Sequence, residues 1–256
     1  MMEIKTPLIF DIKRTSATDG PGIRTVVFFK GCNLDCFWCH NPESKAPYAE
    51  IATYKEKCIG CKECQKVCGK TKDNCISCGK CASVCPVGAK KLFGQRYSVE
   101  DLFEIIQKDR AYYDATNGGV TFSGGECMLY PEYLLQITML CKRNGISVAI
   151  DTAGCVPYEN FEKILPYADL FLYDLKALNP DLHRAGTGKD NSLILENLER
   201  LIKDGADLII RTPVIPNYND TEEKAKIQAY CQQKGLPLEL LTYHNLGVAK
   251  KEALQN

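Results

Sequence analysis

The distribution of cysteines constrains this chain more than any other feature. There are 15 cysteines, and eleven of them lie between Cys32 and Cys85. A secreted disulfide scaffold is usually shorter and begins with a signal peptide, whereas residues 1–5 form no apolar leader. We therefore expect a cytoplasmic protein, whose reduced thiols are free to bind soft metals such as zinc or clustered iron.

Composition places the chain among ordinary globular proteins. Its 256 residues suffice for one large α/β domain with a small insert, and 45% of them are apolar and 25% charged. The formal net charge is +0, so we expect neither nucleic acid nor a membrane surface as a partner. No apolar run approaches the roughly 18 residues that a membrane span needs.

Outside the cysteine region, short apolar runs alternate with segments of helical periodicity. The expected strands are 26–29, 120–122, 147–150, 170–173, 208–210 and 238–241. The expected helices begin at an N-cap at Ser98, at Pro131, at Tyr158, at an N-cap at Ser192 and at Thr221. This alternation gives six βα steps and predicts a parallel sheet, either a barrel or a doubly wound sheet.

The first cysteine motif, Cys32, Cys36 and Cys39, has the spacing C-x3-C-x2-C. Three thiolates on one tight loop can hold three irons of a [4Fe–4S] cube and leave the fourth iron without a protein ligand. An open metal position is what a catalytic site requires. A zinc knuckle, or a chance grouping of three cysteines, is the alternative interpretation.

A second region, between Asn41 and Phe93, has eight cysteines and few apolar residues, so metal is expected to hold it together. Its cysteines form two C-x2-C-x2-C-x3-C quartets, Cys58, Cys61, Cys64 and Cys68, then Cys75, Cys78, Cys81 and Cys85. In two-cluster ferredoxins the fourth cysteine of each run ligates the other cluster. That pattern pairs Cys85 with the first three cysteines and Cys68 with the second three. Two zinc sites are the alternative, and Gly69 in place of proline and the short spacer of residues 69–74 depart from the ferredoxin pattern.

Chemically distinctive residues follow the expected strands. In a βα barrel the site lies at the carboxyl ends of the strands. These ends hold Ser123, Gly124, Gly125, Glu126, Asp151, Thr152, Asp174, Lys176, Arg211 and His244. Each residue alone could cap a helix, form a turn or lie in solvent, but together they predict one site at one end of the sheet.

Several ordered motifs resemble the glycyl-radical-enzyme activating enzymes, a family of radical S-adenosylmethionine (SAM) proteins. The matching runs are Asp19-Gly20-Pro21-Gly22-Ile23-Arg24, Phe29-Lys30-Gly31-Cys32 and Trp38-Cys39-His40-Asn41-Pro42-Glu43, and the resemblance extends over nearly the whole chain. It implies a partial (β/α)6 TIM-like barrel from residues 1–47 and 92–256, with a ferredoxin-like iron–sulfur insert at 48–91. Arg211-Thr212-Pro213-Val214-Ile215-Pro216 and Tyr243-His244-Asn245-Leu246-Gly247 also match family motifs.

The resemblance also implies roles for residues. Gly124, Gly125 and Glu126 are expected to bind the methionine amino group of SAM, through backbone and carboxylate. Asp151, Lys176 and His244 are expected to contact its methionyl or ribose part, with Trp38 and Arg211 also at the cofactor. Asp151, Thr152 and Asp174 match positions near a monovalent-cation site, and Asp19 resembles a residue near the partner's glycine.

The implied reaction is reductive cleavage of SAM to a 5′-deoxyadenosyl radical, which takes a hydrogen from a glycine of a partner enzyme. The expected cofactors are three [4Fe–4S] clusters, SAM and a monovalent cation. The expected partners are a glycyl radical enzyme and a flavodoxin- or ferredoxin-type reductant. Two alternatives remain: a radical SAM enzyme acting on a small molecule, and a ferredoxin-like electron carrier.

The chain stops at Asn256, soon after the His244 motif. Family members usually continue further, so we expect the last helix to be absent and the floor of the SAM site to be less well covered.

Overall fold

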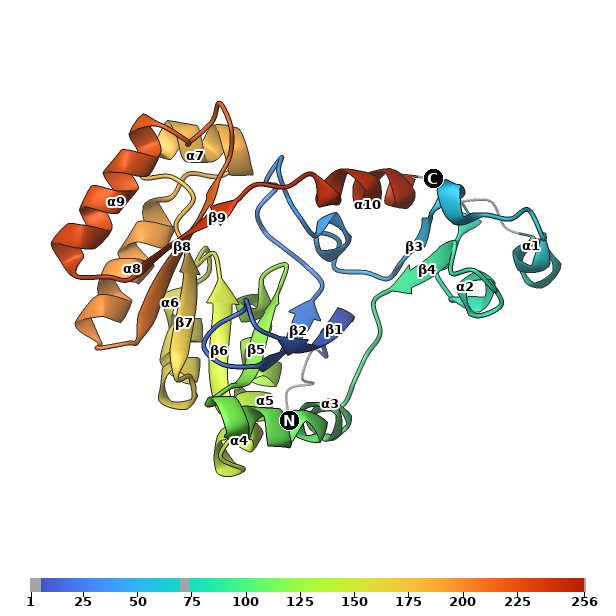
Figure 1. The fold of residues 1–256 in the computed structure, drawn as a ribbon, viewed down its shortest axis with the longest axis horizontal. Coiled ribbons are helices and arrows are strands. Elements are labelled where there is room, and N and C mark those ends of the chain that lie inside the picture. The colour runs from blue at the N-terminus through green and yellow to red at the C-terminus, as the bar shows by residue number, and fades with distance from the viewer. Residues whose placement is uncertain (1–5, 70–73, 256) are drawn as a thin grey trace.

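A computed structural model describes residues 6–69 and 74–255. Its main sheet has the strand order β1-β2-β5-β6-β7-β8-β9, and all neighbouring strands are parallel except β1, which is antiparallel to β2. The strands are β1 Ile9–Ser16, β2 Arg24–Phe29, β5 Gly119–Gly124, β6 Ser147–Thr152, β7 Leu170–Asp174, β8 Leu208–Val214 and β9 Leu238–Thr242. The six expected strands are therefore confirmed, as is the mostly parallel sheet of a partial barrel (Figure 1).

Helices lie between the strands in the chain and cover one face of the curved sheet, except α10 (residues 246–255), which lies beside the β3–β4 region (residues 50–53 and 90–93) (Figure 1). They are α3 Val99–Ile106, α4 Arg110–Thr116, α5 Pro131–Arg143, α6 Tyr158–Ile164, α7 Pro180–Thr187, α8 Ser192–Lys203, α9 Glu222–Lys234 and α10 Leu246–Gln255. Ser98 caps α3 as expected, because its side chain accepts a hydrogen bond from Asp101 N–H at 3.0 Å. Ser192 is instead the first residue of α8, and Asn191 occupies the N-cap position.

Several elements differ from the sequence expectations. The pattern does not predict strand β1, because its outer residues are polar and only its first two, Ile9 and Phe10, bury apolar side chains. Helix α7 is not predicted either. The absence of a last helix is a wrong prediction, because α10 follows β9 and packs against β3.

The core lies between the sheet and its helices. Val27 of β2, Phe122 of β5 and Ile150 of β6 have no exposed surface, and neither do Leu134 and Ile137 of α5. Burial of such apolar surface is the main force that holds a parallel sheet under its helices. The strands are consequently fixed, and so are the residues at their carboxyl ends.

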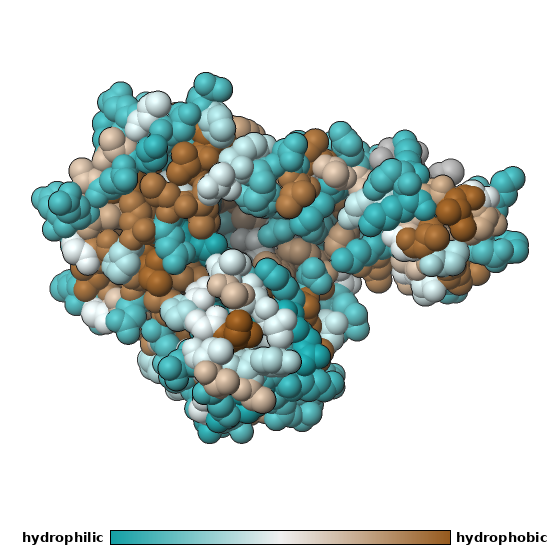
Figure 2. Space-filling model, viewed as in Figure 1, coloured by the Kyte–Doolittle hydropathy of each residue, from teal (hydrophilic) through white to brown (hydrophobic). Residues whose placement is uncertain are grey.

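The cysteine-rich region projects from the barrel (Figures 1 and 2). It contains the hairpin β3 Glu50–Thr53 and β4 Lys90–Phe93, with the short helices α1 Glu63–Val67 and α2 Lys80–Ser83. A small apolar cluster attaches the hairpin to the barrel and α10, and consists of Phe10, Ala52, Phe93 and Ala253. The cysteine-rich region also exposes apolar side chains, namely Ile59, Val67, Ile76, Val84 and Val87.

Some sequence expectations concern residues outside the described ranges. The lack of a leader rests on residues 1–5, and the spacer between the quartets includes residues 70–73. Among the described helices, none has both the length and the apolar character to cross a membrane.

Candidate active site

A cavity of about 600 Å³ lies at the carboxyl ends of the parallel strands, within the range of small-molecule sites. Nearly all the expected site residues line it, which are Asp19, Cys32, Cys36, Trp38, Cys39, Gly124, Gly125, Asp151, Thr152, Asp174, Lys176, Arg211 and His244. Residues from seven separate stretches of the chain thus meet at one place. Glu126 is the expected residue that does not line the cavity.

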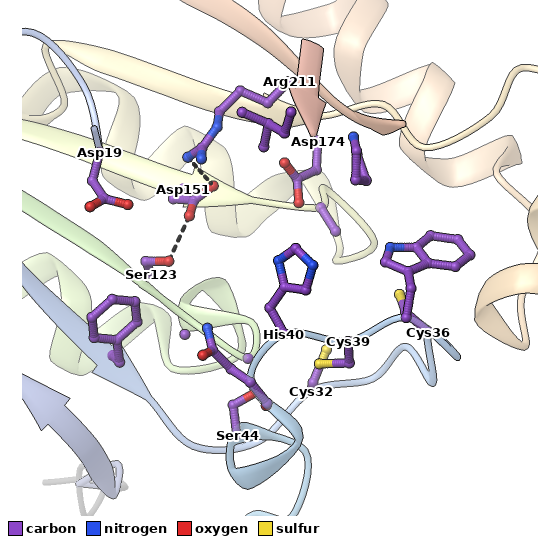
Figure 3. A pocket seen from close by; sticks show the side chains of 18 of the residues that line it. Asp19, Cys32, Cys36, Cys39, His40, Ser44, Ser123, Asp151, Asp174 and Arg211 are labelled. Atoms are coloured by element: carbon purple, nitrogen blue, oxygen red, sulfur yellow. Dashed lines mark hydrogen bonds and ion pairs between the residues drawn. The ribbon is translucent and has the colours of Figure 1, made fainter. Parts of the chain in front are cut away.

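The three cysteines of the first motif form one end of the cavity (Figure 3). Their loop leaves β2 at Gly31, which has φ +100°, and a Cβ there would lie 2.7 Å from the Tyr130 hydroxyl. Burial raises the pKa of the Cys32 thiol to about 12 and that of Cys36 to about 11. Such thiols become thiolates when a metal binds them, because the positive charge replaces the lost hydration.

The loop fits a cluster in two further respects. The N–H of Leu34 points at Cys32 Sγ, 3.5 Å away, and backbone donors of this kind stabilise a thiolate sulfur. In the described part of the chain no three Cys, His, Asp or Glu side chains are gathered as ligands for one metal ion. A cubane does not require that arrangement, since each of its irons takes a separate thiolate.

The Gly124-Gly125 pair lets β5 end directly against the start of the cysteine loop. A Cβ on Gly124 would lie 2.3 Å from Phe29 N, and a Cβ on Gly125 would lie 2.3 Å from Gly31 O. Gly124 also has φ +114°, which side chains disfavour. Glycine is therefore required at both positions for the backbone to line the cavity.

Glu126 is fully buried, and its carboxylate serves the loop after β6. It accepts hydrogen bonds from Thr152 Oγ1 at 2.8 Å, Ala153 N–H at 3.0 Å and Met128 N–H at 3.1 Å. Burial raises the pKa of this carboxyl to about 7, against the opposing effect of these donors. Through these hydrogen bonds Glu126 positions Thr152 and the backbone of Ala153.

Two ion pairs line the cavity, Asp151 with Arg211 and Asp174 with Lys176. Asp151 accepts a hydrogen bond from Ser123 Oγ at 2.6 Å and lies 3.5 Å from Arg211 Nη1. Lys176 Nζ donates to Asp174 Oδ2 at 2.6 Å. Burial raises the pKa of Asp151, and the charge of Arg211 opposes that rise.

Arg211 has unused hydrogen-bonding capacity. Its Nε and Nη1 are buried without a hydrogen-bond partner among the described residues, although the side chain lines the cavity. A buried guanidinium with free donors suits a carboxylate or carbonyl oxygen of a bound molecule.

His244 stacks on His40, with ring centroids 3.7 Å apart and an interplanar angle of 18°. Both rings line the cavity, and His40 Nε2 is buried without a hydrogen-bond partner among the described residues. His40 belongs to the motif of residues 38–43 but is not among the expected site residues. Its place directly after the last cysteine is the signal that could have identified it.

Asp19 lies on the far side of the cavity from the cysteines (Figure 3). Its carboxylate accepts a hydrogen bond from Ser16 Oγ and lies 3.6 Å from Lys13 Nζ. Its backbone carbonyl accepts a hydrogen bond from Thr121 Oγ1 at 2.6 Å, and buried Arg24 donates to the same hydroxyl at 2.8 Å. Arg24 thus fixes the loop that carries Asp19.

A mostly parallel, six-step partial barrel, with a three-cysteine loop after its first parallel strand, defines the class of the protein as a radical SAM fold. The Radical SAM superfamily matches residues 26–227. Two solved structures share the fold at low identity. Streptococcus suis SuiB bound to precursor peptide SuiA has a TM-score of 0.57, 13% identity and coverage of 86% of this chain and 39% of that one. Histidine-tagged anSMEcpe with bound AdoMet has a TM-score of 0.52 and 16% identity, and the match covers 84% of this chain and 49% of that one.

Curated relatives are closer. The trans-4-hydroxy-L-proline dehydratase activating enzyme of Clostridioides difficile is 42% identical over 97% of this chain and 88% of its own length. The (2S)-3-sulfopropanediol dehydratase activating enzyme of Klebsiella oxytoca is 39% identical over 96% and 85%. This chain therefore belongs to the radical SAM superfamily and, within it, to the glycyl-radical-enzyme activating enzymes.

Proposed function

We propose that this protein cleaves SAM reductively and uses the 5′-deoxyadenosyl radical to take an α-hydrogen from one glycine of a partner glycyl radical enzyme. The observation that carries the proposal is the layout of one cavity. Three partly buried thiols form one end, Asp19 lies at the other, and charged side chains lie between them. Such a layout separates a cofactor end from a substrate end.

When bound, a reduced [4Fe–4S] cluster supplies one electron, which breaks the S–C5′ bond of SAM to give methionine and the 5′-deoxyadenosyl radical. Cys32, Cys36 and Cys39 would hold that cluster and leave one iron open. The residues of this chain otherwise bind, orient and exclude water, which preserves a reactive radical for its substrate.

Charge indicates how the cavity residues would bind SAM. The ammonium of Lys176 and the free donors of Arg211 suit the methionyl carboxylate, whereas the carboxylates of Asp151 and Asp174 suit its amino group. Backbone at Gly124 and Gly125 would admit the methionyl chain closely. Trp38, Thr152 and His244 complete the proposed cofactor-binding set.

A monovalent cation near Asp151, Thr152 and Asp174 is part of the proposal, on the basis of the two carboxylates. Each carboxylate also has a basic partner, so the cation must compete with Arg211 and Lys176. A dependence of SAM affinity on potassium concentration, at constant ionic strength, tests this part.

We further propose that residues 48–91 form a separate unit that holds two more [4Fe–4S] clusters and relays electrons from a flavodoxin- or ferredoxin-type reductant. Burial raises the pKa of Cys81, and the charges of Cys68 and Cys75 raise it further, so both lie within electrostatic range of Cys81. That proximity supports Cys68 as the fourth ligand of the second quartet. The thiol of Cys85 has a lowered pKa because backbone N–H groups, first that of Lys90, point at it.

Free thiols that bind iron require a reducing compartment, and we propose the cytoplasm. The barrel, residues 1–47 and 92–256, would then be a soluble enzyme with the cluster unit attached through the β3–β4 hairpin.

The test uses the full chain, reconstituted anaerobically with iron and sulfide and then reduced. We expect an EPR signal that changes when SAM is added, 5′-deoxyadenosine as a product, and a doublet EPR signal on a candidate glycyl radical enzyme. SAM cleavage without a doublet on any partner tested would favour a small-molecule substrate. A reducible cluster that neither responds to SAM nor cleaves it would favour an electron carrier.

A further inference from the structure

The last turn of α7 is hydrogen-bonded to the cysteine loop. Asp35 N–H donates to Thr187 O at 2.7 Å, and Phe37 N–H donates to Gly186 O at 3.1 Å. The last carbonyls of a helix have no donor inside it, so they are free to accept hydrogen bonds from elsewhere. The two donors lie between the cysteines of the loop, one before Cys36 and one after it.

Gly186 makes this contact possible. A Cβ at this position would lie 2.3 Å from the Tyr218 hydroxyl and 2.6 Å from Cζ3 of Trp38. The Trp38 ring is 6% exposed and packs on the Tyr218 ring, with centroids 4.8 Å apart. Helix α7 therefore lies directly on the tryptophan that precedes Cys39, with no room for a side chain between them.

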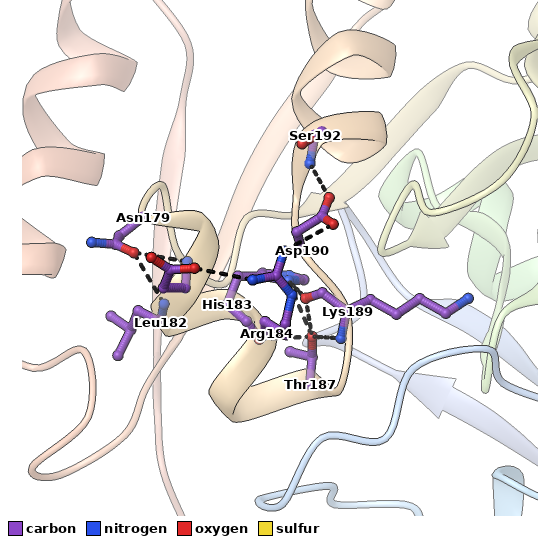
Figure 4. Close-up of polar contacts among 9 residues, drawn as sticks. Asn179, Leu182, His183, Arg184, Thr187, Lys189, Asp190 and Ser192 are labelled. Carbon is purple, nitrogen blue, oxygen red and sulfur yellow. Dashed lines mark hydrogen bonds and ion pairs between the residues drawn. The ribbon is translucent and has the colours of Figure 1, made fainter.

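The end of α7 is itself held firmly (Figure 4). His183 Nδ1 pairs with Lys189 O at 2.6 Å, and Thr187 Oγ1 donates to the same carbonyl at 3.1 Å. Arg184 Nη2 donates to Asp190 Oδ2 at 3.2 Å. These contacts close the turn after the helix and fix the direction of its last carbonyls.

The start of α7 is held as well. Asn179 caps it by accepting from Asp181 N–H at 2.9 Å and Leu182 N–H at 3.0 Å. Tyr218 Oη donates to Leu182 O at 2.7 Å. The helix is consequently fixed at both ends by contacts that do not involve the cysteine loop, and the loop is the element that it can position.

We propose that the C-terminal turn of α7 is the positioning element of the cluster loop. It fixes the backbone of the loop on both sides of Cys36, so that the three thiols can bind one cube. The helix also accepts hydrogen bonds from the N–H groups of Asp35 and Phe37, so these groups do not donate to the cluster sulfurs. Hydrogen bonds to those sulfurs raise the reduction potential of a cluster. The inference rests on the proposed function, because the ligand of the loop is the cluster assigned there.

A matched pair of variants at Phe37 tests the hydrogen bond. Cys39 N–H donates to Cys36 O at 3.3 Å, so Phe37 is the second residue of a four-residue turn, where proline is favoured. Its ring is 60% exposed. Phe37→Pro removes the donor and keeps the turn, whereas Phe37→Ala removes the ring and keeps the donor.

The measurement is EPR of the reduced, reconstituted full chain with and without SAM, together with iron content. We expect the SAM-responsive signal to fall about tenfold in Phe37→Pro and to be retained in Phe37→Ala. Signals that do not respond to SAM, assigned to the insert, should be unchanged in both.

A second pair tests the close approach of the helix. Alanine stabilises a helix relative to glycine by about 1 kcal/mol, so propensity alone favours Gly186→Ala over wild type and disfavours Ala185→Gly. The positioning role predicts the opposite order, in which Gly186→Ala is the damaging variant and Ala185→Gly is tolerated. Gly186→Ala should lose the SAM-responsive signal or shift its midpoint potential upward, whereas Ala185→Gly, at an exposed position, should match wild type.

The outcomes are separable. A wild-type protein without any SAM-responsive signal contradicts the proposed function. Wild-type behaviour of both Phe37→Pro and Gly186→Ala contradicts the positioning role. An equal loss of the SAM-responsive signal in each test variant and its control contradicts it as well. If Gly186→Ala fails to fold, the Phe37 pair decides alone.

Discussion

The Nζ atom of Lys250 lies 2.8 Å from Oε1 of Glu43, a carboxylate whose side chain is 3% exposed. Lys250 also donates to His40 O at 3.1 Å and to Asn41 Oδ1 at 2.9 Å. A Cβ on Gly247 would lie 2.2 Å from Cys39 O, so the first turn of α10 rests on the backbone of the cysteine loop. Helix α10 thus supports the cluster end of the cavity.

Lys250→Met should destabilise this junction, because it leaves the buried Glu43 carboxylate without its cation. Removing one partner of a fully buried pair costs about 3–5 kcal/mol. The Lys250 side chain is 32% exposed, so water replaces part of the interaction and we expect about 1–2 kcal/mol. The melting temperature of the anaerobic protein measures it.

Lys251→Met is the control for this prediction, because Lys251 is the exposed neighbour on the same helix. It should leave the melting temperature unchanged. Equal melting temperatures for Lys250→Met and the wild type would show that α10 does not depend on this ion pair.

The six parallel strands could be predicted because each is an apolar run bounded by turn residues, as Ser147–Thr152 illustrates. Helix α7 was not predicted, because its buried face consists of His183, Gly186 and Thr187 rather than of large apolar side chains. Most of the site followed from one rule, that strand ends meet at one edge. The direction of the Glu126 carboxylate did not, since three hydrogen bonds from other segments determine it.

The first cysteine motif predicts a selective loss of iron. Cys36→Ala should remove roughly four iron atoms per chain, together with the EPR signal that responds to SAM, and leave the insert clusters in place. Cys231→Ala is the control, because Cys231 is a buried residue of α9 outside any cluster motif. Iron analysis and EPR check both variants. A full iron content in Cys36→Ala would contradict the ligand assignment.

Glu126 predicts a pH dependence of stability. Its pKa is about 7 in the folded chain, against 4.5 for an unperturbed group, so the folded chain binds more protons between these values. The free energy of unfolding therefore falls as pH rises through this window. Between pH of about 6 and about 8 we expect a loss of about 1 kcal/mol, read from melting temperatures.

Glu126→Gln should remove this slope. The variant should also be less stable across this pH range. One carboxylate oxygen accepts from Ala153 N–H and the other from Thr152 Oγ1, and the amide nitrogen that replaces one of them cannot accept a hydrogen bond. Glu196→Gln, at an exposed position of α8, should retain the wild-type slope. A wild-type slope in Glu126→Gln would assign the pH dependence to another group.

Asp19 lies at the end of the cavity remote from the cysteines, and this separation predicts that SAM cleavage and partner activation can be uncoupled. Asp19→Asn removes a charge and keeps the acceptor for Ser16 Oγ. We expect the SAM-responsive EPR signal and 5′-deoxyadenosine formation to persist, while glycyl radical formation on the partner falls about tenfold, the effect of one charged hydrogen bond. Asp11→Asn, at an exposed position of β1, is the control and should activate the partner as the wild type does. Parallel losses of both activities in Asp19→Asn would instead place Asp19 among the residues that bind SAM.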